Sequence, residues 1–283
     1  MNSIAIGIDP MIAHLGGFEL RWYGLAIVAA VVVGIWVATM EAKRRGISAD
    51  DIQSLGMWSV IGGIIGARLF HVLDKWEFYL ANPHQILALQ QGGLAIWGGV
   101  VGGVAVGAVY ARRRKLPLAI TADIGALGLI TGQIIGRIGC LINGDAVGGP
   151  TTLPWGFRYV NPNAMLPQAI VDYAREQGRS VAEIAVQPYP LYDMVWNLGV
   201  LAILWHLRTR TRLNGLIFFT YVALYGAGRF VLSFVRVEDQ IFLGLQQAQL
   251  IALGMMLAGI VAVVYLLGKS KKTALAGRAL SAS

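Results

Sequence analysis

Long apolar segments separated by short polar ones dominate the pattern along the chain. Seven of these segments carry few or no charges and are long enough, or nearly so, to cross the roughly 30 Å hydrocarbon layer of a membrane as helices. The pattern therefore predicts an all-α membrane protein, a bundle of seven transmembrane helices within residues 1–268. The seven segments are Trp22–Thr39, Ser54–Leu73, Gly92–Tyr110, Leu118–Ile135, Leu191–Leu207, Gly215–Phe234 and Leu243–Leu267.

The positively charged residues gather in four clusters, and each cluster follows an odd-numbered apolar segment. These clusters hold 14 of the 23 Lys and Arg residues and begin at Lys43, Arg112, Arg208 and Lys269. Because cytoplasmic loops are enriched in Lys and Arg, this distribution predicts an N-terminus outside the cell and a C-terminus in the cytoplasm. We expect an outer region of loops at about residues 140–188, with a short helix near Ala169–Gln177. Residues 269–283 are expected to form a flexible basic tail in the cytoplasm.

The amino-acid composition sets limits on the class of protein. Hydrophobic residues make up 56% of the 283-residue chain and charged residues only 13%, whereas soluble domains carry about 25% charged residues. The formal net charge of +8 does not indicate a nucleic-acid partner, because the basic residues lie between apolar segments. A single cysteine, Cys140, excludes an internal disulfide, and the four histidines lack ligand spacing. We expect no metal, no cofactor and no cleaved signal peptide.

The stretch Gly132–Gly156 joins the end of an apolar segment to a loop rich in Gly and Pro, and Arg137 lies at the junction. Gly136 and Gly139 flank it and permit the backbone and a ligand to approach closely. An arginine at the edge of a bilayer is costly unless it is paired, hydrated or bound to a ligand. Its five donors suit a phosphate. A capped helix end with an arginine that reaches the membrane surface would explain the same spacing.

Other embedded charges are expected to collect near the outer side of the predicted bundle. Arg68, Arg229 and Arg236 lie in or at the ends of the second and sixth apolar segments, and Asp123 lies within the fourth. Inward-facing arginines there would form a site for an anionic head group. For Arg68 and Asp123 the pattern fits helix-locking Arg–Asp pairs equally well, whereas Arg229, beside glycines, favours a functional role.

Glycines recur at four-residue spacing in two apolar segments, and this spacing predicts close packing of helices. They are Gly62 and Gly66 in the second segment, then Gly99, Gly103 and Gly107 in the third. We find no internal sequence repeat, which argues against a secondary transporter built from two related halves.

The stretch GQIIGRIGCLINGDAVGGPTTLPWG at Gly132–Gly156 resembles the signature of the prolipoprotein diacylglyceryl transferases, roughly G-R-x-G-N-F-x-N-x-E-x-x-G followed by P-T-x-L-P-W-G. Five other segments resemble motifs of that family in order and spacing, so the resemblance covers nearly the whole chain. QPYPLYD at Gln187–Asp193, for example, resembles the family's H-P-[ST]-Q-L-Y-E. The others are RWYGL at Arg21, GARLFHVL at Gly66, GGLAIWGGVVGG at Gly92 and GAGRFVLSFVR at Gly226.

This resemblance implies a fold and a reaction. The fold is a seven-span helical bundle in the bacterial plasma (inner) membrane. The reaction takes the diacylglyceryl group of phosphatidylglycerol, attaches it as a thioether to the lipobox cysteine of a preprolipoprotein and releases glycerol phosphate. The partners would therefore be phosphatidylglycerol, the lipobox segment and the surrounding membrane lipids. Because the acceptor cysteine belongs to the substrate, Cys140 is expected to be a small buried residue and no nucleophile.

The resemblance also implies roles for particular residues. Arg137 would bind the phosphate of phosphatidylglycerol, and Arg229 would stabilise the leaving group or orient the thiol. Tyr23 would donate to a phosphate or glycerol oxygen, unless it belongs only to an interfacial aromatic belt. Asp145 is a further candidate for catalysis. The residues expected to contact the substrate are Arg137, Asn143, Gly148, Arg68, Trp97 and Arg236.

The chain departs from the family pattern at several motif positions. Trp97 stands where the family usually has His, and Ser233 stands where it has Glu. Cys140, Gln187 and Pro190 also differ from the pattern. Because Trp cannot accept a proton, activation of the thiol would come from Asp145, from water or from the positive field of the arginines.

Two other functions fit parts of the same pattern. A divergent relative that binds an anionic phospholipid or lipopeptide without turnover would explain the missing His and Glu. A transporter for a small anion would explain the embedded arginines alone. Rescue of a strain depleted of its own transferase distinguishes the enzyme from the binding protein, and anion flux into liposomes identifies a transporter.

Overall fold

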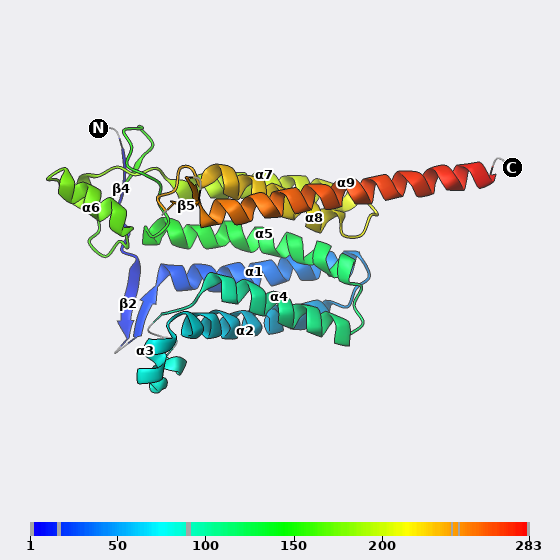
Figure 1. Cartoon of the computed structure of the whole chain (residues 1–283), viewed down its shortest axis with the longest axis horizontal. Coiled ribbons are helices and arrows are strands. Elements are labelled where there is room, and N and C mark those ends of the chain that lie inside the picture. The colour runs from blue at the N-terminus through cyan, green and yellow to red at the C-terminus, as the bar shows by residue number, and fades with distance from the viewer. Residues whose placement is uncertain (1–2, 16–17, 89–91, 239, 243, 282–283) are drawn as a thin grey trace. The chain divides into compact units, whose positions relative to one another are not determined.

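The fold is mainly helical, and most of each predicted apolar segment lies on a helix (Figure 1). The predicted start of the seventh segment, Leu243, lies outside the described residues. A computed structural model describes residues 3–15, 18–88, 92–238, 240–242 and 244–281. The long helices are α1 Trp22–Arg44, α2 Ala49–Asp74, α4 Ile96–Arg113, α5 Leu118–Asn143, α7 Tyr189–Arg210, α8 Leu216–Leu232 and α9 Gln247–Ser281. The shorter ones are α3 Trp76–Ala81, α6 Gln168–Glu176, and the 3-10 helices η1 Pro83–Leu87 and η3 Val181–Glu183. The short helix expected near Ala169–Gln177 is confirmed as α6.

Three short two-stranded sheets occur in the described part of the chain, and the apolar pattern did not predict them. Strand β1 (Ile4–Ile6) pairs in parallel with β4 (Phe157–Tyr159). The antiparallel pairs are β2 (Met11–Leu15) with β3 (Phe18–Arg21), and β5 (Gln240–Phe242) with β6 (Leu245–Gln246). Because each strand has only two to five residues, none produces a long alternating pattern in the sequence.

Among the described residues, four helices are long and apolar enough to cross a membrane, by length and composition: α1, α2, α5 and the part of α9 up to Ser270. Helix α8 is apolar but shorter. Several of these helices expose large apolar side chains, among them Trp36 at 60% and Val261 at 68% of their full surface. Contiguous apolar surface of this kind marks a membrane or protein contact. The chain is therefore a multi-pass helical membrane protein.

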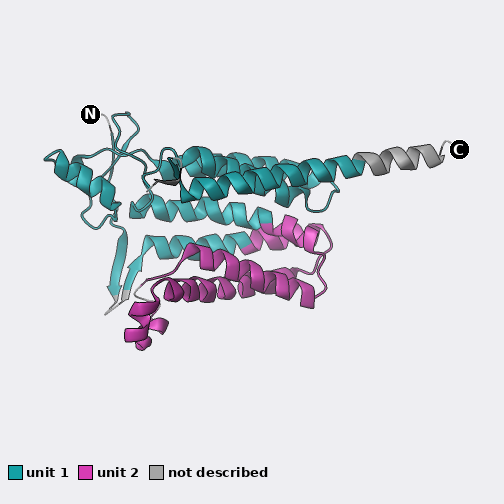
Figure 2. Cartoon of the chain, in the orientation of Figure 1, with its two compact units in different colours: residues 1–34, 126–283 teal, residues 35–125 magenta. Residues whose placement is uncertain are grey.

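The chain divides into two compact units, which Figure 2 shows in different colours. Unit 1 comprises residues 1–34 and 126–283, and unit 2 comprises residues 35–125. Helices α1 and α5 each contribute to both units.

In unit 2, helices α2 and α4 pack with their backbones in close approach. A Cβ atom added at Gly66 would lie 2.9 Å from the Cα atom of Gly102 and would also overlap the carbonyl oxygen of Gly98. A Cβ atom at Gly99 would have only ordinary contacts, at 3.6 Å. The glycine spacing therefore predicted the packing correctly, but the closest backbone contacts on α4 involve Gly98 and Gly102, each one residue before the predicted Gly99 and Gly103.

Unit 2 also contains buried charges that lock its elements together. Asp123, fully buried on α5, forms a 3.2 Å salt bridge with Arg45, which also pairs with buried Glu41 at 2.7 Å. Arg45 follows the last turn of α1, so Asp123 belongs with the basic cluster there and not with the expected group of outer charges. Of the two interpretations left open for Asp123, its contacts favour the helix-locking pair.

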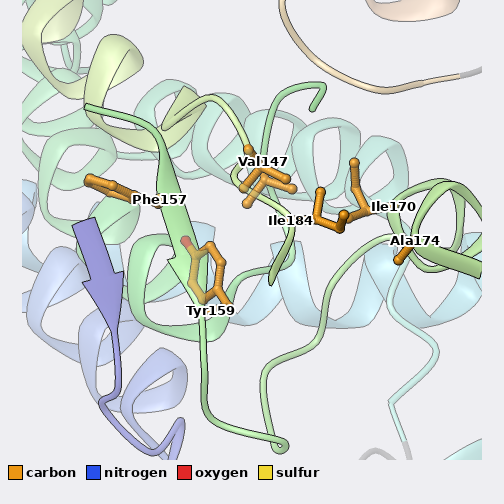
Figure 3. Packing of buried hydrophobic residues seen from close by; sticks show 7 residues of the cluster. Val147, Phe157, Tyr159, Ile170, Ala174 and Ile184 are labelled. Carbon is orange, nitrogen blue, oxygen red and sulfur yellow. The ribbon is translucent and has the colours of Figure 1, made fainter. Parts of the chain in front are cut away.

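In unit 1, the region after α5 has a hydrophobic core of its own (Figure 3). Val147, Phe157, Tyr159, Ile170 and Ile184 are each at most 6% exposed, and they come from the loop after α5, from β4, from α6 and from the segment after η3. The Tyr159 hydroxyl donates to the carbonyl of Leu141 in the last turn of α5 at 2.9 Å. This core therefore fixes the loop region against the end of α5.

Backbone hydrogen bonds in unit 1 bring the ends of three helices together. The Gly148 N–H donates to the carbonyl of Gln187, two residues before α7, at 2.9 Å. The Gly149 N–H donates to the carbonyl of Val235, just after α8, at 3.0 Å. A Cβ atom at Gly148 would lie 2.8 Å from both Gln187 Cβ and the Val235 oxygen, so only glycine fits between these segments. The C-terminal end of α5, the start of α7 and the end of α8 therefore meet.

Candidate functional site

Arg137 lies on the last two turns of α5, because this helix continues beyond the predicted end at Ile135 to Asn143. Its Nε donates to Oδ2 of Asp193 on α7 at 2.5 Å, and its side chain is 18% exposed. Asn197, one turn further along α7, donates to the same carboxylate oxygen at 3.2 Å. A charge-assisted pair of this kind fixes the guanidinium more firmly than a neutral hydrogen bond would.

Two further arginines of the site come from α8 and the segment after it. The side chain of Arg229 is 18% exposed and that of Arg236 is 21% exposed. The Glu238 carboxylate lies 2.8 Å from the Arg236 guanidinium and 4.0 Å from that of Arg229. Glu238 is half-buried, so one carboxylate lies beside both cations.

A buried tyrosine at the start of α7 lies against all three arginines. The guanidinium carbons of Arg137, Arg229 and Arg236 are 5.5, 5.9 and 5.5 Å from the centre of the Tyr189 ring. Arg229 also donates a hydrogen bond to the Tyr189 hydroxyl. We call these three arginines and Tyr189 the arginine cluster. Arg137 and Arg229, predicted from separate segments of the sequence, therefore contact a common side chain.

The loop after α5 adds further polar groups to unit 1. Asn143, the last residue of α5, is buried, and its Oδ1 has no hydrogen-bond partner among the described residues. Asp145 is accessible at the surface, yet desolvation by the surrounding protein raises the pKa of its carboxyl above the usual value. A hydrogen bond with the Asn143 side chain and the positive charges of Arg236 and Arg137 lower the pKa of Asp145 and so partly offset this rise. Gly148 holds this loop in place through its close backbone contacts.

Two other residues singled out in the sequence lie close to Arg137. Cys140, one turn further along α5, has its sulfur 3.8 Å from the Arg137 guanidinium and is half-buried. Tyr23, at the start of α1, is 37% exposed. A Cβ atom at Gly139 would lie 3.2 Å from the Tyr23 Cα, so this glycine permits α1 to pack against α5 beside Arg137.

Arg68 and Trp97, both expected to contact the substrate, belong to unit 2. Arg68 is 8% exposed, and its guanidinium donates four hydrogen bonds to backbone carbonyls at 2.5–2.9 Å. The acceptors are Gln85, Ile86, Gly92 and Gly93. Arg68 therefore holds the segment between α2 and α4 through backbone carbonyls. These contacts of Arg68 are not the Arg–Asp pair that the helix-locking interpretation expected. Trp97 lies in the first turn of α4 and is 38% exposed.

The chemistry of the site is that of anion binding. Within the described ranges, no group of three or more His, Cys, Asp or Glu side chains is arranged to hold a metal ion. Guanidinium groups that are fixed by partners keep donors available for phosphate oxygens in a defined geometry. The fold and the site together define a class: a multi-pass membrane protein with a largely buried arginine cluster, whose donors are chemically suited to an anionic group.

Comparison with known proteins identifies the family within that class. The model of the family described as prolipoprotein diacylglyceryl transferase matches residues 10–265. A phosphatidylglycerol–prolipoprotein diacylglyceryl transferase of Clostridioides difficile (strain 630) is 33% identical over 93% of this chain and 98% of the relative. Relatives of the same name from Lysinibacillus sphaericus and Bacillus cytotoxicus are both 35% identical, over 94% and 91% of this chain and 94% and 92% of their own lengths. The chain therefore belongs to the prolipoprotein diacylglyceryl transferase family, as its motifs predicted.

Sequence reasoning missed Tyr189 as a member of the site. Apolar patterning places Tyr189 two residues before the predicted segment Leu191–Leu207, where aromatic residues are common at membrane interfaces. One signal was available in QPYPLYD, where Tyr189 stands at the position of Ser or Thr in the family pattern. Asp193 stood in the sequence only as the last residue of the QPYPLYD motif, because nothing in the sequence indicates which arginine it contacts.

Proposed function

We propose that this chain is a membrane-embedded transferase that moves the diacylglyceryl group of phosphatidylglycerol to the cysteine thiol of a prolipoprotein. The names of its relatives, which match over more than nine-tenths of the chain, support this function. The observation that carries the proposal is the arginine cluster, because Arg137, Arg229 and Arg236 lie around one buried ring. Such a cluster suits the phosphodiester of an anionic lipid.

The proposed reaction is a substitution at a glyceryl carbon. The thiolate sulfur attacks that carbon and forms a C–S bond, while the bond from the carbon to the phosphate oxygen breaks. The leaving glycerol phosphate takes the electron pair, and the thiol proton passes to a base or to water. A free thiol has a pKa of about 8.5 and needs activation at neutral pH. Fixed cations stabilise the charge that develops on the leaving phosphate.

We assign the roles of individual residues within this proposal. Arg137 binds the lipid phosphate, since Asp193 orients its guanidinium. Arg229 stabilises the leaving group, and Arg236 supports the same anion. Tyr23 donates to a phosphate or glycerol oxygen, and Asp145 is a candidate to receive the thiol proton.

Other groups complete the substrate site in this proposal. Asn143 and Gly148 shape the pocket for the head group, and the unpartnered Oδ1 of Asn143 can accept from a glycerol hydroxyl. Substrate contacts by Arg68 and Trp97, which belong to unit 2, stay predictions that rest on the family resemblance alone. The acceptor is the lipobox segment of a preprolipoprotein, and phosphatidylglycerol enters laterally from the surrounding lipids.

The proposed membrane arrangement has seven spans. It adds α4, α7 and α8 to the four helices that are long and apolar enough by composition. The N-terminus lies outside, the basic loops lie in the cytoplasm, and the region at about 140–188 lies on the outer face of the bacterial inner membrane. Residues 1–268 form the membrane domain, and residues 269–283 form its basic cytoplasmic tail.

Arg137→Ala tests the proposed function directly. We expect transfer from phosphatidylglycerol in mixed micelles to a fluorescent lipobox peptide to fall by at least about 100-fold, because one fixed donor to a developing anion contributes that much. Mass spectrometry measures the gain of one diacylglyceryl unit on the peptide. Arg137→Lys keeps the charge but loses the planar fork of donors, so it should retain only part of the activity.

Arg175→Ala is the matched control, because Arg175 is an exposed arginine on α6 with a side chain 75% accessible. This variant should transfer at the wild-type rate. Full activity in a folded Arg137→Ala protein would contradict the role of Arg137 in binding the lipid phosphate. Phosphatidylglycerol binding without any transfer by the wild-type protein would instead identify the non-catalytic lipid-binding relative.

A further inference from the structure

Tyr189 is fully buried, yet it contacts cations from three separate parts of the chain. Its ring lies within 5.9 Å of guanidinium carbons from α5, from α8 and from the segment after α8. No apolar side chain could take this position without placing an apolar surface against three charged groups. The surroundings of Tyr189 therefore suit an aromatic ring that contacts arginines.

The backbone fixes the position of this ring. Tyr189 lies between Pro188 and Pro190 at the first turn of α7, and its N–H donates to the carbonyl of Gln187 at 2.8 Å. Proline restricts the backbone on both sides of Tyr189. Gln187 is itself tied to Gly148 and Gly149 by backbone hydrogen bonds at 2.9 and 3.0 Å. The ring is therefore held at a fixed position, and the long, flexible arginine side chains can pack against it.

An aromatic ring acts on arginines in a different way from a carboxylate. Like charges repel each other, and the negative face of an aromatic ring attracts cations, most strongly where water is excluded. The ring does this without adding a negative charge. It also leaves most N–H donors of the guanidinium free for oxygen ligands. Only Arg229 gives a donor to Tyr189, through its hydroxyl.

We propose that Tyr189 is a positioning residue that holds Arg137, Arg229 and Arg236 in the arrangement that binds the lipid phosphate. This inference rests on the proposed function, and Tyr189 acts through the arginines and does not touch the substrate. The ring sets the affinity for the anionic lipid, and the hydroxyl sets the orientation of Arg229.

The experiment compares Tyr189→Leu, which removes the ring, with Tyr189→Phe, which removes only the hydroxyl. KM for short-chain phosphatidylglycerol, KM for the lipobox peptide and kcat are measured for each purified protein. Tyr189→Leu should raise KM for the lipid on the order of tenfold, as expected for lost contacts between cations and a desolvated ring. KM for the peptide should not change. Tyr189→Phe should keep the wild-type KM for the lipid and lower kcat, because Arg229 loses its hydrogen bond.

Tyr221→Leu is the control for a general effect of losing a buried tyrosine. Tyr221 lies on α8, is 6% exposed, and its hydroxyl accepts from Gln133 at 2.9 Å. This change should lower thermal stability and leave KM for the lipid unchanged. A structural defect alone would reduce the active fraction, and hence apparent kcat, without altering KM for the lipid.

Two results would overturn the proposal: a wild-type KM for the lipid in Tyr189→Leu, or an equal rise in KM in Tyr221→Leu. If Tyr189→Leu does not fold, Tyr189→Met replaces it, since Met fills a similar volume without a ring. A folded Met variant with wild-type KM for the lipid would then overturn the proposal in the same way.

Equilibrium binding of phosphatidylglycerol, with phosphatidylcholine as the reference lipid, separates this inference from the proposed function. If the wild-type protein binds phosphatidylglycerol but does not transfer it, and the ring-deleted variant loses that binding, the transferase function fails and the role of Tyr189 holds. If the wild-type protein transfers and the variants bind and transfer equally well, the transferase function holds and the role of Tyr189 fails.

Discussion

At the scale of single residues, the buried pair of Arg137 and Asp193 determines how the site is built. Asp193 is only 3% exposed, and both Arg137 and Asn197 donate to one of its carboxylate oxygens. A buried ion pair stabilises little by itself, but loss of one partner leaves an uncompensated charge. Neither residue can therefore be replaced alone without a cost in stability.

Asp193→Asn should destabilise the folded protein by about 3 kcal/mol, because Arg137 would remain buried without its counter-charge. Thermal unfolding in detergent measures this loss, and transfer activity should fall with it as the guanidinium loses its orientation. The control is Asp172→Asn on α6, where the pair with Arg175 is exposed and the expected change is within about 0.5 kcal/mol. Equal melting temperatures for the two variants would contradict this account.

At the scale of elements, helix ends and helix contacts depend on individual glycines. Helix α5 extends past Arg137 to Asn143, so the arginine is presented from a helix and not from a loop. Gly139 lets α1 pack closely against this part of α5. Helices α2 and α4 approach through Gly62, Gly66, Gly98 and Gly102. In a membrane such contacts stabilise a helix pair mainly by close van der Waals packing.

Gly66→Ala should therefore destabilise the pair of α2 and α4, while Gly99→Ala should not. An added methyl group at Gly66 meets the backbone of Gly98 and Gly102, which cannot move aside easily, and overpacking of this kind costs about 1–3 kcal/mol. The same methyl group at Gly99 has contacts of 3.6 Å. Because both changes have the same effect on helix propensity, a difference in melting temperature in detergent reports packing. Equal stability of the two variants would show that the helices accommodate a methyl group at Gly66 without a loss of stability.

At the scale of the whole molecule, the basic clusters predict how the chain is oriented in the membrane. The region after α5 has its own hydrophobic core, and the clusters beginning at Lys43, Arg112 and Arg208 follow α1, α4 and α7 in the chain. Loops rich in Lys and Arg stay in the cytoplasm. The region with the hydrophobic core should then lie on the outer face.

Cysteine labelling of intact cells measures this orientation. In a Cys140→Ala background, Gln177→Cys after α6 should react with a membrane-impermeant maleimide from outside. Arg113→Cys, at the end of α4, should react only after the cells are made permeable. Both positions are exposed in the structure, so accessibility to the reagent depends on the side of the membrane. The reversed labelling pattern would show that the chain has the opposite orientation in the membrane to the one proposed.

The positions of the helices and several residues of the site could be predicted from the sequence alone, for a definite physical reason. A segment that must satisfy its backbone hydrogen bonds in lipid has to be an apolar helix, so most of each predicted segment lies on one. Arg137 and Arg229 were identified because charge is rare and costly in such segments. Family motifs pointed to Asn143, Asp145 and Gly148 in the same way.

Only the tertiary structure decided which of these groups meet. The contacts of Tyr189 with three arginines, of Asp193 with Arg137, and of Asp123 with Arg45 join residues far apart in the chain. Hydrophobic patterning specifies which face of a helix is apolar, but it does not indicate which other helix packs against that face. That choice depends on side-chain packing and on backbone hydrogen bonds such as those from Gly148 and Gly149, which form only once the chain has folded.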